Sequence, residues 1–470
     1  MWVRLSMGAG WYPFPPQMEA TNGDDEPKQT ARQQAGQHTV AMSSRDEDGV
    51  LRSLDLLRVK FEAATLPRVA NERRIVLFTA QEPSGDAHAA PVIARLRERY
   101  PEIEPVAWGG PKMEAAGATM LGRTADDGVM GLAGISKVVE VKRLHDEIVG
   151  WASKNPVAVH MPVDSPSANY PLCARLKPMG IKVVNLVAPQ LWAWAPWRIG
   201  KVRRLSDILL CLLPFEEEWF RSRGVVAKFI GHPLLSKPID VVRADAEAAA
   251  LPAGAPKIVL LPGSRSSEVR ANGLLIAKTF ALVRARHPQA AAIVFASNSA
   301  NAERFVAACG GALPEGVRVM VAGRDGTIEG AIRWADVAIA VSGTVSLDCT
   351  RQSRPVVGVY RTSWIEATLA GLVLRSPNRL LPNIVAGRRI VPEFVPYAGG
   401  PEPIAREVLR LIEDAAVRSR TVADLDHVVA QFMARDPGPI AAEVLAQSVA
   451  GKRLDNAAID QIVANAMRAE

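Results

Sequence analysis

Short apolar runs alternate with segments of helical spacing along most of the chain, and this alternation restricts the fold more than any other feature. "RIVLFTA" (74–80) precedes a helical pattern at 88–100, and "VAVHMPV" (157–163) precedes another helix. The same order resumes with "KIVLL" (257–261). A strand, a helix and a further strand form a right-handed parallel crossover. The sequence therefore predicts an α/β protein with two doubly wound parallel sheets.

Length and composition divide the chain into four parts. A chain of 470 residues is too long for one ordinary core, so two domains are expected. Residues 1–72 are rich in Gln, Asp, Ser and Gly and cannot bury enough apolar surface to offset ordering, so we interpret them as a disordered extension. Two doubly wound domains are expected at 73–235 and 236–425, and alanine-rich helices at 426–470.

The charge balance favours an anionic partner. The chain carries 56 Lys and Arg against 49 Asp and Glu, which gives a net charge of +7. Such a balance suits a nucleotide, a phosphorylated lipid or an acidic membrane surface. The basic residues do not form a recognisable nucleic-acid-binding module, so no nucleic acid is expected as a partner.

The sequence shows no pattern for metal binding or membrane insertion. The four cysteines contain no C-x-x-C pair, so we expect no zinc site, no disulfide framework and a reducing cytoplasm. No apolar run reaches the roughly 18 residues that a membrane-spanning helix needs. The first residues lack a charged start followed by an apolar segment, so no signal peptide is expected.

Two turns at expected strand ends of the first domain carry polar side chains. Open parallel sheets bind ligands at the carboxyl ends of their strands. In "QEPSGDAH", Ser84, Gly85 and Asp86 either line a ligand site or cap the following helix. Asp164 ends a buried strand, where an apolar setting raises the pKa of a carboxyl toward that of a general base. The alternative is that Asp164 caps the next helix, and both roles can hold together.

Two turns of the second domain have the composition of phosphate sites. A glycine lets backbone N–H groups approach an oxygen, and a hydroxyl and a guanidinium add donors near a helix N-terminus. An acid one turn into the second helix suits ribose hydroxyls. The turns comprise Gly263, Ser264, Arg265 and Glu268 in "PGSRSSE", and Ser342, Gly343, Thr344 and Asp348 in "SGTVSLD". Together they predict a nucleotide-sugar donor domain that faces an acceptor domain.

Many motifs of the chain resemble those of the lipid-A-disaccharide synthase family and occur in the same order. Between about Arg74 and Phe394 they include "EPSGD", "GGPKMEAAG", "DSPSAN", "LWAW", "LLPFE", "FIGHPL", "LLPGSRSSEV", "SGTVSLD" and "LPNIVAG" followed by "VPE". The resemblance implies a GT-B type fold, in which two Rossmann-like domains face a cleft.

The same resemblance implies an inverting glycosyltransferase of lipopolysaccharide assembly. Such an enzyme joins UDP-2,3-diacylglucosamine to 2,3-diacylglucosamine 1-phosphate (lipid X) through a β-1,6 bond and releases UDP. No metal and no cofactor are implied, because backbone turns and Arg265 would neutralise the charge. By matched motif, Asp164 resembles the proposed base, Arg265 the donor-binding arginine, and Asn383 a further functionally important position.

The chain departs from the family pattern mainly in its first half. Gln81 replaces a glycine, Ser167 replaces a second acid, and "LVAPQLWAWAPWR" lacks the serines around its proline. In the second half, Asp348 stands where the family usually has Glu. The acceptor side is therefore less well defined by the sequence than the donor side.

A segment rich in tryptophan lies beside a basic segment. Aromatic rings next to positive charges suit a surface over anionic lipids, while the alternative is a packed tryptophan cluster beside a solvated helix face. The acylated substrates favour the lipid surface, and hence a cytoplasmic protein held peripherally at the inner membrane; a homo-oligomer is compatible with this. The residues are Trp192, Trp194, Trp197, Arg198, Lys201, Arg203 and Arg204.

Two other functions remain open at this stage. A UDP-sugar epimerase shares the architecture but needs one sugar site and gives no reason for a basic surface with tryptophans. A non-catalytic protein that binds nucleotide sugars or lipids is supported by the substitutions in the first half, and opposed by the joint presence of Asp164, Arg265 and Asn383. His232 in "GHP" is either a residue of the ligand site or part of a structural turn.

Overall fold

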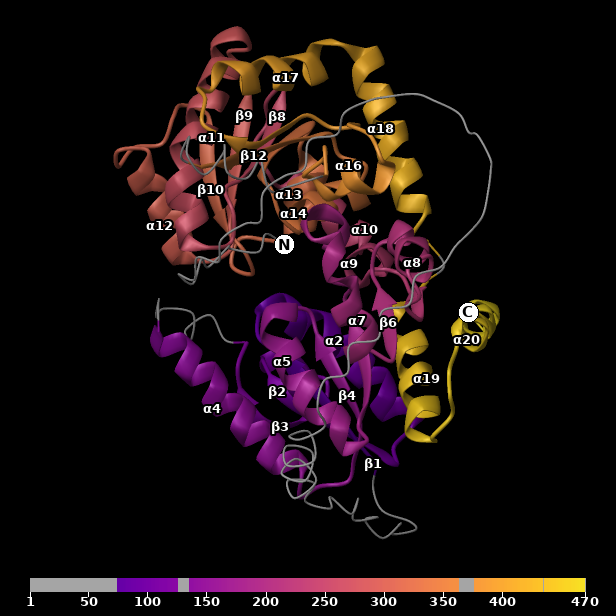
Figure 1. The fold of residues 1–470 in the computed structure, drawn as a ribbon. Helices are drawn as coiled ribbons and strands as arrows, with labels where there is room; N and C mark the ends of the chain where they lie inside the picture. Colours follow the sequence, from indigo (N-terminus) through magenta and orange to yellow (C-terminus); the bar gives the residue numbers. More distant parts are fainter. Residues whose placement is uncertain (1–73, 126–134, 363–375, 434, 470) are drawn as a thin grey trace, which may run out of the picture. The chain divides into compact units, whose positions relative to one another are not determined.

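The computed structural model describes residues 74–125, 135–362, 376–433 and 435–469. The disordered extension predicted at 1–72 therefore lies outside the described residues. Within them, two parallel β-sheets are each covered by helices (Figure 1). The predicted α/β class with two doubly wound parallel sheets is confirmed.

The first sheet has seven parallel strands in the order β3-β2-β1-β4-β5-β6-β7. Its inner strands are apolar runs mostly buried on both faces, as expected for a parallel sheet covered by helices, whereas the edge strand β3 is partly exposed. From β1 the chain builds outward to β3, then returns to place β4 on the other side of β1. The strands are β1 (Arg74–Ala80), β2 (Ile103–Gly109), β3 (Thr119–Arg123), β4 (Val157–Val163), β5 (Lys182–Leu186), β6 (Ile208–Cys211) and β7 (Ala227–Phe229).

Helices cover both faces of this sheet because successive side chains of a strand point to opposite faces. Val76 and Phe78 pack in the cluster that contains α2 and α19 (Pro437–Val449), whereas Leu77 packs on the opposite face with α4 and α5. The other elements of this part are α2 (Pro83–Arg99), α3 (Pro111–Ala115), α4 (Ile135–Ala152), α5 (Pro166–Leu176), η2 (Lys177–Met179), α6 (Leu191–Trp194), η3 (Pro196–Arg198), α7 (Ile199–Leu205), α8 (Pro214–Arg221), α9 (Pro233–Ser236) and α20 (Asn456–Ala469).

The second sheet repeats this plan with six parallel strands in the order β10-β9-β8-β11-β12-β13. Ile258 and Leu260 pack against α11, α12 and α17, whereas Val259 packs on the opposite face with α13, α14 and α18. The strands are β8 (Lys257–Leu261), β9 (Ala291–Ala296), β10 (Val317–Val321), β11 (Val337–Val341), β12 (Val356–Arg361) and β13 (Glu393–Tyr397). The helices are α10 (Val241–Ala249), α11 (Ser266–Arg286), α12 (Ser299–Ala308), α13 (Ile328–Trp334), α14 (Val345–Arg351), α16 (Leu381–Ala386), α17 (Glu402–Glu413) and α18 (Ala415–Ala430).

The strand order reverses once in each sheet. In the first sheet β1 pairs with both β2 and β4, and in the second β8 pairs with both β9 and β11. The helices that follow the two central strands of each sheet pack on opposite faces, and in open parallel sheets ligands bind at the carboxyl edge where this occurs. Each sheet therefore has one preferred place for a ligand.

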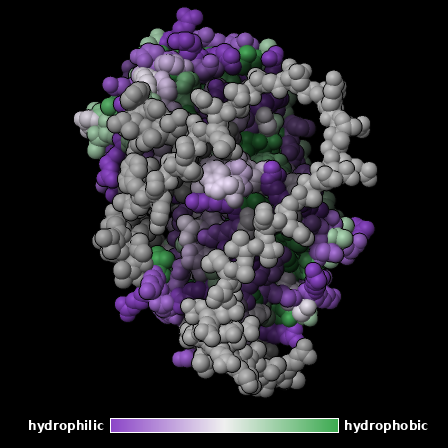
Figure 2. Space-filling view, viewed as in Figure 1, coloured by the Kyte–Doolittle hydropathy of each residue, from purple (hydrophilic) through white to green (hydrophobic). Residues whose placement is uncertain are grey.

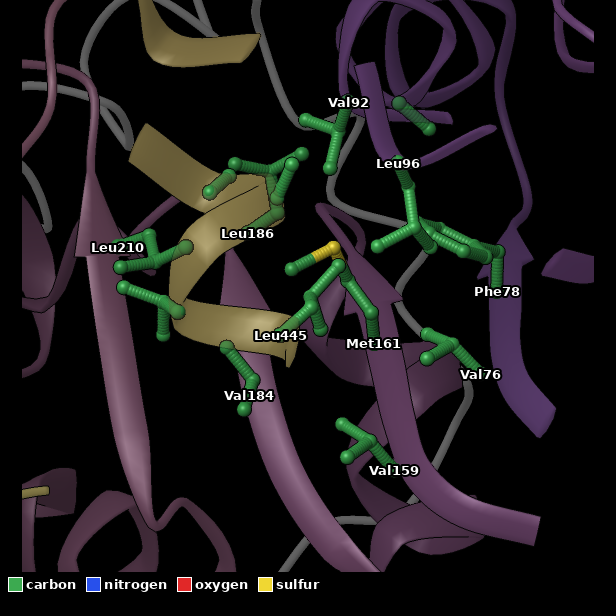
Figure 3. Packing of buried hydrophobic residues seen from close by; sticks show 14 of the residues in the cluster. Val76, Phe78, Val92, Leu96, Val159, Met161, Val184, Leu186, Leu210 and Leu445 are labelled. Carbon is green, nitrogen blue, oxygen red and sulfur yellow. The ribbon is translucent and has the colours of Figure 1, made fainter. Parts of the chain in front are cut away.

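The last helices return to the first sheet. Phe432, just after α18, still packs in the core of the second sheet, whereas Ile440 and Leu445 of α19 are buried in the core of the first. Figure 3 shows Leu445 beside Met161 of β4 and Val184 of β5. The first core is thus completed by a segment from the far end of the chain, and its stability depends on that segment.

We expect Leu445→Ala to lower the free energy of unfolding by about 2–5 kcal/mol, because it removes a fully buried side chain and leaves a cavity beneath β4 and β5. Met433→Ala is the matched control, since that side chain is 61% exposed. Urea unfolding of both variants tests this. Equal stability of the two variants would show that α19 is not part of the first core.

Candidate active site

The four polar turns identified in the sequence lie at the two points where the strand order reverses. The turns after β1 and β4 belong to neighbouring strands of the first sheet, and the turns after β8 and β11 to neighbouring strands of the second. Two pairs of turns that are far apart in the sequence are therefore brought together, one pair on each sheet.

Asp164 follows β4 directly and is only 8% exposed. It has a φ of 54°, and Ser165 follows with a φ of 43°, so two non-glycine residues in succession adopt the left-handed conformation. Ser165 precedes the first residue of α5, and no side chain caps this helix end with a hydrogen bond. The alternative in which Asp164 acts only as the helix cap is therefore not supported by the geometry.

The surroundings of Asp164 raise the pKa of its carboxyl above the ordinary value. Burial, together with the nearby charge of Glu82, raises the pKa of the Asp164 carboxyl to about 6. The backbone N–H of Ser165 and the hydroxyl of Ser84 act in the opposite direction; Ser84 Oγ donates to Asp164 Oδ2 at 3.3 Å. A carboxyl with this pKa is mostly ionised at neutral pH and able to accept a proton.

The residues predicted as a turn after β1 form the first turn of α2; one of them faces Asp164 and two hold the structure. Ser84 reaches Asp164, as described above. Gly85 allows close packing of α2, because a Cβ there would lie 3.1 Å from Ala80 Cβ and 3.2 Å from the carbonyl oxygen of Val163.

Asp86 is 2% exposed, and its carboxylate accepts hydrogen bonds from three backbone N–H groups at the start of α3. These come from Gly110 (3.2 Å), Lys112 (2.9 Å) and Met113 (2.9 Å). Both carboxylate oxygens of Asp86 are therefore engaged by the protein itself.

The turn after β8 is closed on itself by Glu268. Its Oε2 accepts the N–H groups of Ser264 (3.1 Å) and Arg265 (3.2 Å), and its Oε1 lies 2.8 Å from Arg265 Nη1. Gly263 has a φ of 106° and a Cβ there would lie 2.6 Å from Glu268 Cβ, so this close approach requires glycine. The carboxylate of Glu268 occupies the N–H groups that an external anion would otherwise use.

A second layer fixes the same turn. The carbonyl oxygen of Ser264 accepts from Asn301 Nδ2 at 2.7 Å and from Ser297 Oγ at 3.3 Å. Asn301 lies near the start of α12 and is 2% exposed. Since the backbone is braced, the half-exposed guanidinium of Arg265 is the adaptable part of this turn.

The turn after β11 leads into α14 with little covering it. Ser342 is buried and its N–H donates to Val359, while nothing lies within 4 Å of a Cβ placed on Gly343, and Thr344 is exposed. Asp348 lies one turn inside α14, where burial raises the pKa of its carboxyl to about 7 against the opposing charge of Arg351, 3.8 Å away.

Asn383 is fully buried, and its amide group is occupied by the segment that leads into β13. Nδ2 donates to the carbonyl oxygen of Val391 (2.9 Å) and to Glu393 Oε2 (3.0 Å), while Oδ1 accepts the N–H groups of Ile390 (2.8 Å) and Val391 (2.9 Å). All four hydrogen-bonding positions of this side chain are thus used within the protein.

The segment rich in tryptophan divides into buried and exposed residues. Trp192 is part-buried; its Nε1 donates to Glu216 at 3.1 Å and its ring packs on Phe215. Trp194 is also part-buried, beneath the guanidinium of Arg198. Trp197 is 65% exposed. The basic residues around it, Arg198, Lys201, Arg203 and Arg204, are exposed as well.

Trp197 differs from the other described tryptophans in its exposure. On the face shown in Figure 2, hydrophilic side chains cover most of the described surface and hydrophobic ones occupy small separate areas. Within the described ranges, every other tryptophan is at least part-buried. The predicted surface thus retains one aromatic side chain and four basic ones.

Two buried acids, Glu216 and Glu393, were not singled out in the sequence. Glu216 is 2% exposed, and burial raises the pKa of its carboxyl to about 8; it also accepts the N–H of Leu213 at 3.2 Å. Glu393 accepts the N–H groups of Arg379 and Leu380 at the start of α16. Both acids end quoted motifs, "LLPFE" and "VPE", and that position was the available signal.

His232 caps α9, since its Nδ1 accepts the N–H of Leu234.

Among the described residues, no helix is long and apolar enough to cross a membrane. Across the same part of the chain, no group of three or more His, Cys, Asp and Glu side chains is placed to hold a metal ion.

Comparison with solved structures addresses the fold alone. A UDP-N-acetylglucosamine 2-epimerase from Neisseria meningitidis bound to UDP-GlcNAc matches with a TM-score of 0.52 at 10% identity, over 80% of this chain and 99% of that chain. A Staphylococcus aureus protein, MnaA with UDP, matches with a TM-score of 0.53 at 9% identity, over 79% and 95%. The chain therefore shares its fold with these two proteins.

Comparison of the sequence is more specific. The family model "Lipid-A-disaccharide synthetase" matches residues 76–435. The lipid-A-disaccharide synthase of Anaeromyxobacter dehalogenans is 35% identical over 390 residues, which are 81% of this chain and 98% of that protein. The enzyme of Pseudomonas aeruginosa is 30% identical over 377 residues, 80% and 98% respectively. The chain therefore belongs to the lipid-A-disaccharide synthase family, the GT-B glycosyltransferases of lipid A biosynthesis.

Proposed function

We propose that this chain transfers 2,3-diacylglucosamine from UDP to the 6-hydroxyl of 2,3-diacylglucosamine 1-phosphate, with inversion at the anomeric carbon. A β-1,6 bond forms, UDP leaves, and the hydroxyl proton passes to the protein. The observation that carries the proposal is the pairing of polar turns at the strand reversal of each sheet. One pair offers a buried acid, and the other offers backbone N–H groups, hydroxyls and an arginine.

Asp164 is the general base in this proposal. The acceptor hydroxyl is a poor nucleophile at neutral pH, and its proton must leave as the new bond forms. The ionised carboxyl of Asp164 accepts that proton, and Ser84 holds one carboxylate oxygen in place. UDP departs from the opposite face of the sugar, so one base on the acceptor side is sufficient.

The turns after β8 and β11 bind the diphosphate of the donor. Arg265 neutralises phosphate charge with its guanidinium, which presents several N–H donors in one plane. Gly343 and Thr344 lie at the start of α14 and add backbone N–H groups and a hydroxyl. Asp348, one turn further, contacts the ribose, and its shorter side chain relative to Glu leaves room for a bridging water.

Donor binding requires an exchange at Glu268. Glu268 accepts hydrogen bonds from the N–H groups of Ser264 and Arg265 and from the guanidinium of Arg265. A diphosphate carries more charge than one carboxylate, so it competes for Arg265 while Glu268 keeps the turn closed. Glu268 therefore holds the turn rather than the substrate.

Asp86 and Asn383 support the site from within the protein. The hydrogen-bonding atoms of both side chains are engaged within the protein, by backbone groups and, for Asn383, also by Glu393, so neither side chain contacts substrate in this proposal. Loss of either would disturb the segment that it holds, the start of α3 or the segment before β13. An effect on activity would then follow from altered structure.

The reaction is tested by UDP release from UDP-2,3-diacylglucosamine with and without 2,3-diacylglucosamine 1-phosphate. Release that depends on the acceptor, with formation of the disaccharide, supports the proposal. Release without acceptor would indicate hydrolysis or the epimerase alternative, and binding without release would indicate a non-catalytic protein.

We expect Asp164→Asn to lose roughly 10²–10⁴-fold in turnover, since Asn keeps the shape of Asp but cannot accept the proton. Affinity for UDP should be unchanged, because the donor turns belong to the other sheet. The variant should be no less stable at pH 7, because it removes a carboxyl whose ionisation is opposed by burial. Asp146→Asn is the control, at an exposed acid that pairs with Arg175.

The pH dependence provides a second measurement on the same residue. The ionised form of Asp164 is the active one, so kcat/KM should fall as the pH decreases through about 6 and should be level above it. An ordinary aspartate would titrate near 3.9. A profile that is flat between pH 7 and 5, with Asp164→Asn fully active, would remove Asp164 from the mechanism.

We expect Arg265→Ala to weaken UDP binding by about ten- to a hundredfold, since a hydrogen bond to a charged group contributes about 1.5–3 kcal/mol. Arg270→Ala removes the same charge from an exposed position on α11 and should leave the affinity unchanged. Calorimetric titration with UDP measures both. Equal affinities of the two variants would exclude Arg265 from the donor site.

Trp197 and the basic residues around it form the proposed contact with anionic lipid at the cytoplasmic face of the inner membrane. The exposed ring enters the headgroup region and the positive charges stay at its surface. Trp192 is left out of this contact because its indole N–H is bound to Glu216.

We expect the double variant Arg203→Glu/Arg204→Glu to bind anionic vesicles at least about 30-fold more weakly, at about 1 kcal/mol per basic residue near the surface. Arg97→Glu/Arg99→Glu makes the same change of charge on the exposed end of α2 and serves as the control. Vesicle sedimentation measures both, and added salt should weaken binding of the unaltered chain. If both double variants bind alike, only the net charge matters and no specific surface exists.

A further inference from the structure

Four buried side chains form a continuous chain of hydrogen bonds behind Asp164. They belong to β1, β4 and α5, and each is at most 1% exposed. The hydroxyl of Thr79 lies 2.8 Å from Asn169 Oδ1 and 2.9 Å from His160 Nε2. His160 Nδ1 lies 3.8 Å from Cys173 Sγ.

The chain ends on the backbone of the strained turn. Asn169 Nδ2 lies 3.2 Å from the carbonyl oxygen of Val163 and 2.7 Å from that of Asp164. Carbonyl oxygens only accept, so the amide nitrogen donates to both, and Oδ1 must face Thr79. The two peptide groups on either side of the Asp164 Cα are thereby held by one side chain.

The positions of the remaining hydrogens follow from this end of the chain. The single hydroxyl hydrogen of Thr79 is donated to Asn169, so its oxygen accepts from His160 Nε2. His160 Nδ1 then carries no hydrogen and accepts from the Cys173 thiol. Every link therefore runs in one direction, from Cys173 to the turn.

The ionisation of the two titratable members agrees with this order. Burial, and after it the charge of His145, lowers the pKa of His160 to about 3, so the imidazole is neutral. Burial raises the pKa of the Cys173 thiol to about 12, so it retains its hydrogen. Each donor and acceptor of this hydrogen-bond chain therefore has a partner, and the hydrogen bonds keep one arrangement across the physiological pH range.

The backbone held in this way does not adopt its conformation readily by itself. Asp164 and Ser165 are left-handed in succession, and neither is glycine. Val187, after the neighbouring β5, is also left-handed, and the N–H of Asp164 donates to Leu186 just before it. Strained conformations of this kind persist only where the surroundings determine them.

We propose that Thr79, His160 and Asn169 are positioning residues that hold the Asp164 carboxyl in the orientation needed for proton transfer. This inference rests on the proposed function of Asp164 as the base. Without these hydrogen bonds, the turn at Asp164 relaxes toward an ordinary backbone conformation, and the Asp164 carboxyl moves away from the position of the acceptor hydroxyl. A displacement of about 1 Å is enough to lower the rate of such a step by roughly a hundredfold.

The decisive substitution is Thr79→Val, which keeps the shape of the side chain and removes the central hydroxyl. We expect turnover to fall roughly 10–100-fold, with KM for the donor and the affinity for UDP unchanged. Thr79→Ser restores the hydroxyl and should restore turnover to within about threefold. Thr279→Val is the matched control: Thr279 is equally buried, and its hydroxyl bonds only to Leu275 within α11 of the second sheet.

A double-mutant cycle with Asp164→Asn separates positioning from general loss of structure. If Thr79 acts through Asp164, Thr79→Val should cost no further turnover once Asp164 is Asn. Additive losses, or a loss equal to that of Thr279→Val at equal melting temperature, would overturn the inference. If Thr79→Val does not fold, Thr79→Ala with Thr279→Ala as control makes the same comparison. A fully active Asp164→Asn would instead refute the assignment of the base, so the two failures are distinguishable.

Discussion

The parallel pairing of β1 with β4 and of β8 with β11 is the constraint on which the site depends. Parallel strands end at the same edge, and the reversal of strand order at these two pairs leaves their turns uncovered by crossing helices. A polar residue just after one of these strands is therefore presented at the edge even when the strand itself is fully buried. Asp164, with 8% of its surface exposed, is such a residue.

The acids of the predicted site and of the segments beside it differ in what their carboxylates bind. Asp86, Glu268 and Glu393 each accept several backbone N–H groups at the start of a helix. These carboxylates take the place of the anion that a helix N-terminus favours. Asp164 and Asp348 are instead buried in surroundings that raise the pKa of their carboxyls to about 6 and about 7. Because their carboxylates do not close a helix start, Asp164 and Asp348 are the acids proposed to contact the substrates.

The sequence was sufficient to predict the two parallel sheets and the four turns, because strand ends and glycine-containing turns are local signals. It was not sufficient to assign partners. Asp86 and Asn383 follow the pattern of site residues, yet the carboxylate of Asp86 binds backbone groups 24 to 27 positions away. The amide group of Asn383 binds backbone groups 7 and 8 positions away and the Glu393 side chain 10 positions away. The contribution of α19 to the first core was also hidden, since apolar helix positions do not say which sheet they cover. Partner choice depends on tertiary packing, which no local pattern contains.

The proposed base and its proposed supports lie on different elements for the same reason. Thr79 is on β1, His160 on β4 and Asn169 on α5, so the hydrogen-bond chain can form only after these elements have packed. A strained turn stabilised in this way is present only in the folded state, because no single segment of the sequence determines its conformation. The turn at Gly263, which is proposed to bind the donor, is built differently, because Glu268, five residues further along the chain, closes it locally. The turn at Asp164 is thus fixed by long-range packing and the turn at Gly263 by a local cap.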